Sequence, residues 1–227
     1  MIAVFETYDI AFVGVPKCMT TSVLRSFYQC EHGAAFDRAG FGGNIHRYYR
    51  QVAGRYAARH EPPDLTGLGA FWTFTILRNP IKRLLSVYTN RVLGHRDVEK
   101  ALARAGDQGL DPMPGPDAFF RDLDLYRALV PSIRHHTDPF AQFLGPDMAR
   151  YDAVFHVEDV ARLRLVLSQR MGQPLVLENE QRSRRSLVFA DLSRAAREKI
   201  ITHTQGDFEL LHAHYSLEHS LRALQGA

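Results

Sequence analysis

The stretch IAFVGVPKCMTTSVLRSFY at residues 10–28 decides the fold predicted for this chain. Its first six residues, IAFVGV (10–15), form an apolar run that predicts a short buried strand. The segment PKCMTTS (16–22) interrupts the run as a turn, and residues 20–30 then carry the apolar spacing of an amphipathic helix. A strand, a phosphate-sized loop and a helix in this order open many nucleotide-binding α/β domains.

The rest of the chain repeats the alternation of apolar runs and helix-like segments. Residues 74–77 and 153–157 are short apolar runs, so each predicts a buried strand. Predicted helices cover residues 80–92, 159–171, 192–204 and 207–221. Strands that alternate with helices indicate a parallel sheet. The sequence therefore predicts an α/β fold: one P-loop-like, three-layer domain over residues 1–227, with a central parallel sheet flanked by helices.

Composition limits the possible function classes. The chain has 227 residues, 45% of them apolar, which suits a domain with its own core. A formal charge of +3 is too weak to indicate a nucleic-acid partner, although it suits a small anionic cofactor. The longest apolar-rich run, residues 70–77, is far shorter than the roughly 20 residues of a transmembrane helix. We therefore expect no nucleic-acid partner and no transmembrane segment.

The N-terminus and the cysteines bear on the compartment. The start, MIAVFETYDIAF, lacks a basic segment followed by an apolar stretch, so no signal peptide is predicted. The two cysteines, Cys18 and Cys30, make neither a disulfide framework nor a zinc site. We expect a cytoplasmic protein.

The segment PKCMTTS has the properties of an anion-binding loop. Backbone N–H groups at the start of a helix are unpaired, and the helix dipole favours an anion there. Lys17 adds a positive charge, and Thr20, Thr21 and Ser22 add hydroxyl donors. The competing interpretation is a polar helix cap, because Ser and Thr are common capping residues.

A second candidate motif is RNPIKRLLSVY, residues 78–88. Arg78 is predicted at the carboxyl end of a strand, where open α/β sheets bind their ligands. Ser86 is predicted on the polar face of the following helix together with Arg83. An arginine fork and a hydroxyl can hold a phosphate. The alternative is an amphipathic helix with an exposed basic face.

Together the two motifs resemble those of sulfotransferases that use 3′-phosphoadenosine-5′-phosphosulfate (PAPS), most closely the carbohydrate branch with its heparan 2-O and chondroitin types. In that family PK-x-(G/A)-(S/T)-T-(S/N/W) holds the 5′-phosphosulfate, and R-x-P-x-x-R-x-x-S-x-Y holds the 3′-phosphate. The matching positions are Pro16, Lys17, Thr20, Thr21, Ser22, Arg78, Pro80, Arg83, Ser86 and Tyr88. Weaker similarity at 135–144, 151–160 and 207–215 extends the resemblance over roughly residues 8–216. Met19 departs from the pattern, because the family usually has Gly or Ala there.

The resemblance implies sulfuryl transfer from PAPS to a hydroxyl acceptor, with PAP as product and without a metal ion. The acceptor it implies is a carbohydrate or glycoconjugate. Lys17 would stabilise the leaving oxygen, and Arg78 and Ser86 would bind the 3′-phosphate. The loop residues implied to bind the cofactor are Lys17, Cys18, Met19, Thr20, Thr21 and Ser22.

A general base must take the proton of the acceptor hydroxyl. Family members resembling this chain generally take this residue from between the two phosphate motifs. We place it on His46, which is predicted to end a short strand in GNIH, with His136 as the alternative base or substrate contact. His60 lies in the same interval, beside Pro62-Pro63, where a loop is expected.

Three further interpretations remain open at this stage. An ATP-dependent P-loop kinase would need GxxxxGK[ST], which PKCMTTS lacks. A non-catalytic module that binds PAP is the second, for which the departure at Met19 argues mildly. The third concerns the basic loop with Asn179, Arg182, Arg184 and Arg185, which would either close over the cofactor or form a solvated charged turn.

Overall fold

The computed structural model describes residues 1–37, 39–52, 56–57, 65–106, 109–177 and 187–225. They divide into two compact units, each with its own hydrophobic core. The first unit comprises Met1–Arg78 and Phe140–Arg182, and the second comprises Asn79–Pro139 and Ser183–Ala227.

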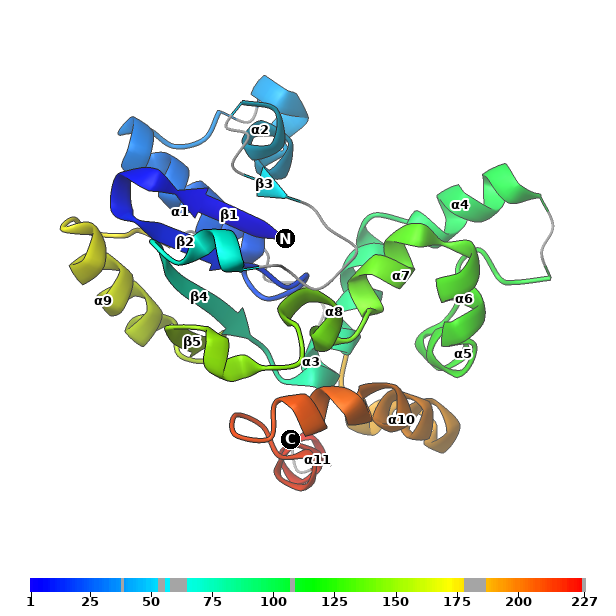
Figure 1. Ribbon diagram of the computed structural model, residues 1–227. Helices are drawn as coiled ribbons and strands as arrows, with labels where there is room; N and C mark the ends of the chain where they lie inside the picture. Colours follow the sequence, from blue (N-terminus) through cyan, green and yellow to red (C-terminus); the bar gives the residue numbers. More distant parts are fainter. Residues whose placement is uncertain (38, 53–55, 58–64, 107–108, 178–186, 226–227) are drawn as a thin grey trace. The chain divides into compact units, whose positions relative to one another are not determined.

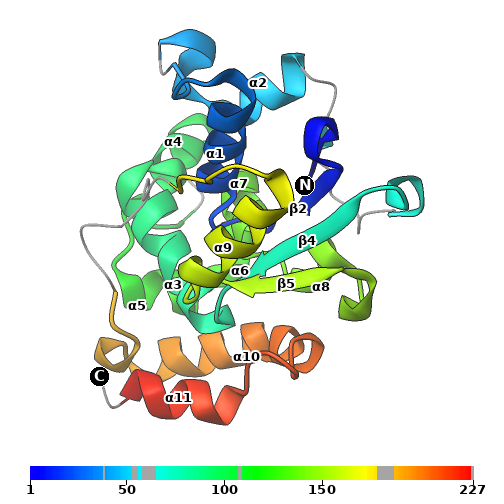
Figure 2. The same ribbon diagram turned by 90° about the vertical axis from the view of Figure 1, so that its left-hand side faces the viewer.

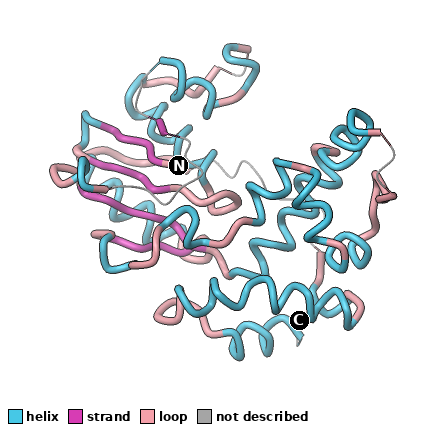
Figure 3. The backbone as a smooth tube through the Cα atoms, turned by 45° about the vertical axis from the view of Figure 1, so that its right-hand side comes forward, coloured by secondary structure: helices cyan, strands magenta, loops and turns pink. Residues whose placement is uncertain are grey.

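All strands of the described residues belong to the first unit, where they form one sheet (Figures 1 and 3). The order is β3-β1-β2-β4-β5, and β2, β4 and β5 are parallel to one another. The bounds are β1 Ile2–Phe5, β2 Ile10–Val13, β3 Tyr56–Ala57, β4 Trp72–Leu77 and β5 Ala153–His156. The predicted α/β fold with helices flanking a sheet is confirmed.

The sheet is mixed rather than wholly parallel, because β1 runs antiparallel to both of its neighbours. The sequence analysis missed β1, which pairs Ile2 with Val13 and Phe5 with Ile10 as a hairpin. Every residue of β2 is buried. A fully buried strand reads as a continuous apolar run, and this explains why β2 was recognised from the sequence.

Three helices of the first unit cover one face of its sheet. They are α1 (Thr20–His32), α2 (Ile45–Val52) and α9 (Val160–Met171), and a further short helix, α8, spans Phe140–Leu144. Apolar residues of α1, α2 and α9 form a single core with Phe12, Phe74 and Phe155 of the strands. Figure 2 shows α9 crossing β4 and β5. The same face therefore holds α1, and with it the end of the predicted anion loop.

The second unit consists of helices in its described residues. They are α3 (Pro80–Val87), a π-helix (Tyr88–Gly94), α4 (Asp97–Ala105), α5 (Pro116–Arg121), α6 (Leu123–Leu129), α7 (Pro131–Thr137), a 3-10 helix (Phe189–Asp191), α10 (Arg194–Leu210) and α11 (Leu217–Gln225). The break predicted between residues 204 and 207 is wrong, because α10 runs through it. The buried residues Ile200, Thr204, Asp207 and Phe208 continue one helical face across that point.

Candidate active site

The backbone of the loop between β2 and α1 has an unusual conformation. Lys17 and Met19 both have positive φ angles, 70° and 58°, which non-glycine residues rarely adopt. Such residues cost of order 1–3 kcal/mol each and cluster at ligand sites. Alternation of this kind turns successive N–H groups toward one side of the chain, as in the concave nests that bind anions.

Gly14 lets the start of α1 approach the end of β2. A Cβ atom at this position would lie 2.9 Å from Cγ2 of Thr20 and 2.8 Å from the terminal carbon of Met1. Real Cβ contacts are not that short, so a larger residue would force the side chains of Met1 and Thr20 to shift. The close packing fixes the loop at the carboxyl end of β2.

The start of α1 is not closed by a side chain. Its N-cap residue is Met19 in the left-handed conformation, with no side-chain capping hydrogen bond. The interpretation of Thr20, Thr21 and Ser22 as a polar cap is therefore wrong, since all three lie inside the helix. The first N–H groups of a helix have no intrahelical acceptor, and they carry the positive end of the helix dipole. The arrangement suits an oxyanion.

Arg78 meets the loop directly. It follows β4, which pairs in parallel with β2, so both segments leave the same edge of the sheet. The guanidinium Nη1 of Arg78 donates to the backbone carbonyl of Lys17 over 3.3 Å. The side chain of Arg78 thus contacts the loop that holds Lys17, at the carboxyl ends of the strands.

His46 lies beside the first turn of α1. Its Nε2 is 3.1 Å from the hydroxyl oxygen of Thr21. The prediction that His46 ends a strand is wrong: it lies in the first turn of α2. Asn44 caps this helix, since its side-chain oxygen accepts from the N–H groups of His46 and Arg47. Asn44 in the segment GNIH therefore marks the start of a helix and not the end of a strand.

The other residues of the second motif belong to the second unit. Ser86 lies on α3 and donates its hydroxyl to the carbonyl of Arg83 over 2.6 Å. Arg83 is 2% exposed, so the interpretation of an exposed basic face is wrong for it. Its guanidinium pairs with Asp207 at 3.6 Å. The predicted role of Ser86 beside Arg78 stays a prediction.

His136, the alternative base, lies at the end of α7 in the second unit. Its Nδ1 is 2.7 Å from the carbonyl oxygen of Ser132. A carbonyl only accepts, so Nδ1 carries the proton and the neutral ring has its lone pair on Nε2. His60 and the basic loop with Asn179, Arg182, Arg184 and Arg185 lie outside the described residues.

Sequence reasoning missed His156. It ends β5 and is paired with Leu77, the residue before Arg78. Burial is the main reason that its pKa lies below the ordinary value for histidine. A histidine directly after an apolar run such as AVF was the available signal, because the carboxyl ends of neighbouring parallel strands share one edge.

The described residues show neither a metal-binding cluster nor a membrane-spanning helix. They contain no group of three or more His, Cys, Asp or Glu side chains that could hold a metal ion. No helix among them is long and apolar enough to cross a membrane.

The fold is α/β, and a candidate anion-binding loop lies at the carboxyl ends of its parallel strands. The profile of the sulfotransferase family matches residues 1–216. The chain therefore belongs to the sulfotransferase family, whose members transfer sulfuryl groups. Neither the curated proteins nor the solved structures yielded a significant match.

Proposed function

We propose that the protein transfers the sulfuryl group of PAPS to a hydroxyl of a carbohydrate or glycoconjugate and releases PAP. The observation that carries the proposal is the contact between Arg78 and the carbonyl of Lys17. It joins a phosphate-type loop to a second basic residue. A donor with two separate anionic groups, a 5′-phosphosulfate and a 3′-phosphate, could bind the loop through the first group and Arg78 through the second.

The residues present fit this donor. The positive-φ residues of the loop and the uncapped start of α1 suit the oxygens of a phosphosulfate. The neighbouring hydroxyls of Thr20, Thr21 and Ser22 add donors. Arg78, and Ser86 on the strength of the sequence motif, are proposed to bind the 3′-phosphate. PAPS supplies an activated sulfuryl group when bound.

The remaining steps fall to side chains of this chain. Lys17 is proposed to place its ammonium where negative charge develops on the leaving oxygen. His46 is proposed to accept the proton of the acceptor hydroxyl at Nε2, the atom now beside Thr21. His136 remains the alternative base or substrate contact, with its lone pair on Nε2. The loop and Arg78 orient the donor, so most of the catalysis is positioning and charge neutralisation.

A transfer assay with PAPS labelled in the sulfuryl group tests this function. Pools of oligosaccharides and other hydroxyl compounds are offered as acceptors, with Lys17→Met as the matched inactive control. The proposal predicts label in a carbohydrate pool with the wild type and far less with the variant. Binding of PAP with no labelled product in any pool would favour the non-catalytic module. Phosphorylation of an acceptor by ATP that EDTA abolishes and magnesium restores, without sulfuryl transfer, would favour the kinase.

A further inference from the structure

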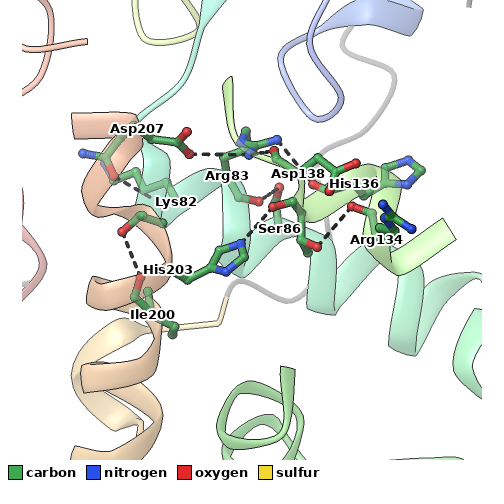
Figure 4. A network of polar contacts seen from close by, with 12 residues as sticks. Lys82, Arg83, Ser86, Arg134, His136, Asp138, Ile200, His203 and Asp207 are labelled. Carbon is green, nitrogen blue, oxygen red and sulfur yellow. Dashed lines mark hydrogen bonds and ion pairs between the residues drawn. The ribbon is translucent and has the colours of Figure 1, made fainter. Parts of the chain in front are cut away.

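Arg83 belongs to the second motif by sequence, but its contacts in the second unit indicate a structural role rather than phosphate binding. Its guanidinium donates to two backbone carbonyls, that of His136 over 3.3 Å and that of Asp138 over 2.5 Å. It also pairs with Asp207 of α10, and both side chains are 3% exposed. Figure 4 shows Arg83 of α3 between Asp207 and the segment with His136 and Asp138.

Two more basic side chains converge on the same turn. Arg127 of α6 donates to the Thr137 hydroxyl over 2.5 Å and to the Asp138 carboxylate over 2.9 Å. His203 of α10 lies with its Nε2 2.8 Å from the Thr137 carbonyl, so it donates from that nitrogen. The carbonyls of residues 136, 137 and 138 therefore all accept from side chains of other helices.

These contacts stabilise the end of a helix that is too short to be stable alone. α7 spans only Pro131–Thr137, and isolated helices shorter than about 12 residues are marginal in water. The last carbonyls of a helix lack intrahelical donors and carry the negative end of its dipole. Arg83 of α3 and His203 of α10 donate to these carbonyls, and Arg127 of α6 adds a positive charge beside them, so the last turn of α7 stays helical.

The state of His136 depends on that turn. Its Nδ1 reaches the carbonyl of Ser132, four residues earlier, only while the backbone between them is helical. The contact fixes the proton on Nδ1 and leaves the Nε2 lone pair as the basic atom. If the end of α7 unwound, the imidazole would lose this partner and its single tautomer.

We propose that Arg83 is a positioning residue, which holds the last turn of α7 and thereby His136 in one tautomer, and is not a ligand of the cofactor's phosphate. A role of His136 toward the acceptor rests on the proposed function. The effect of Arg83 on the His136 tautomer does not depend on that function. The two claims are therefore separable by experiment.

The test variant is Arg83→Met/Asp207→Leu. Removing both partners avoids an unpaired buried charge, and apolar replacement of a buried pair is often tolerated. The matched control is Arg194→Met/Glu198→Gln, which removes an exposed pair on the same helix, α10. Arg83→Lys is the second variant; it keeps the charge beside Asp207, but an ammonium lacks the fork that spans two carbonyls.

The readouts are the nitrogen chemical shifts of the His136 ring, assigned by their loss in His136→Gln, and the PAP dissociation constant. Spectra are taken well above the ordinary histidine pKa of about 6.5, so the ring is neutral. We expect the Nδ1-protonated form in the wild type and the control, and a mixture of tautomers in the double variant. The fraction of the Nδ1-protonated tautomer in Arg83→Lys should lie between those of the wild type and the double variant.

PAP affinity should change by less than about twofold, whereas loss of a phosphate ligand would cost about tenfold or more. A loss of that size in folded protein would overturn the proposal, as would an unchanged His136 tautomer in both variants. If the double variant does not fold, Arg83→Lys decides by the same two readouts. If the wild type does not bind PAP, the proposed function fails, while the tautomer comparison still tests the role of Arg83.

Discussion

His46 and Thr21 face each other across the first turns of α2 and α1, with Nε2 of the imidazole 3.1 Å from the hydroxyl oxygen. The pair connects a titratable ring to the helix start that the proposed donor would occupy. A hydroxyl can donate to the imidazole or accept from it, so an acceptor hydroxyl can take the place of Thr21 as the partner of Nε2.

If His46 is the general base, His46→Ala keeps PAP binding and loses on the order of 10² to 10⁴ in turnover. The proton of the acceptor then has no positioned recipient, while the loop and Arg78 are untouched. Turnover and PAP affinity are measured side by side, with His136→Ala as the comparison. Near-normal turnover in His46→Ala would refute the assignment, and an equivalent loss in His136→Ala alone would transfer it to that residue.

Lys17→Met is predicted to reduce kcat far more than PAP affinity. The ammonium is proposed to act on charge that develops only as the bond breaks, so its loss falls on the transition state. Steady-state kinetics and PAP titration separate the two effects. A rise in KM with unchanged kcat would show that Lys17 binds ground and transition states equally.

Alanine usually stabilises a helical segment more than glycine does, but the left-handed backbone at Met19 predicts the opposite order there. Met19→Gly should be more stable than Met19→Ala by about 1 kcal/mol, because only glycine adopts this conformation without a steric penalty. Both lose the same packing against the core of the first unit. Denaturant unfolding measures the difference.

The control for that pair is Ala195→Gly on the exposed surface of α10. There glycine should be less stable than alanine, because the backbone is right-handed and glycine loses more conformational freedom on folding. A Met19→Ala protein more stable than Met19→Gly would show that residue 19 is not left-handed in solution.

His203 predicts a loss of stability in mild acid. Burial, followed by smaller effects of Arg127 and Arg83, holds its pKa below 6.5, although the Thr137 carbonyl and Asp207 act in the opposite direction. The unfolded state then binds more protons, so the free energy of unfolding decreases as the pH falls below about 6.5 toward the folded pKa. Denaturant unfolding of the wild type and His203→Gln across this range tests it. The variant should show a shallower dependence, and equal slopes would contradict the prediction.

The sequence predicted those parts of the structure whose signals are local. β2 is a continuous buried run, and the loop and helix after it are adjacent in sequence, so the first half of the site was visible in residues 10–28. The hairpin strand β1 was missed, since its pairing with β2 depends on two segments. His46, predicted as the general base, contacts Thr21 but lies on a helix rather than at a strand end, because the cap at Asn44 was not recognised.

The sequence motif at residues 78–88 could not show which of its side chains are buried. Arg83 and Ser86 look alike as polar positions on one helix, yet Arg83 is 2% exposed and bound to Asp207, which lies over a hundred residues away in sequence. Spacing along a helix gives the face of a residue but not the partner that covers that face. The single domain predicted for residues 1–227 likewise stays a prediction beside two compact units.

Arg78 carries the predicted preference for a 3′-phosphate. Arg78→Ala should weaken PAP binding by about 2 kcal/mol, as loss of a charge-assisted hydrogen bond does, and should leave ADP binding nearly unchanged. Calorimetric titration of both nucleotides into the wild type and the variant measures this. Equal losses for PAP and ADP would mean that Arg78 acts on the loop through the Lys17 carbonyl rather than on the 3′-phosphate.

The most direct test of the proposed PAPS site needs no acceptor. The melting temperature of the wild-type protein is measured with PAP, ADP and AMP at equal concentrations, since a ligand that binds the folded state stabilises it more the tighter it binds. The account predicts a clearly larger increase with PAP than with either of the others, because only PAP carries the 3′-phosphate. Equal increases with PAP and ADP would contradict it.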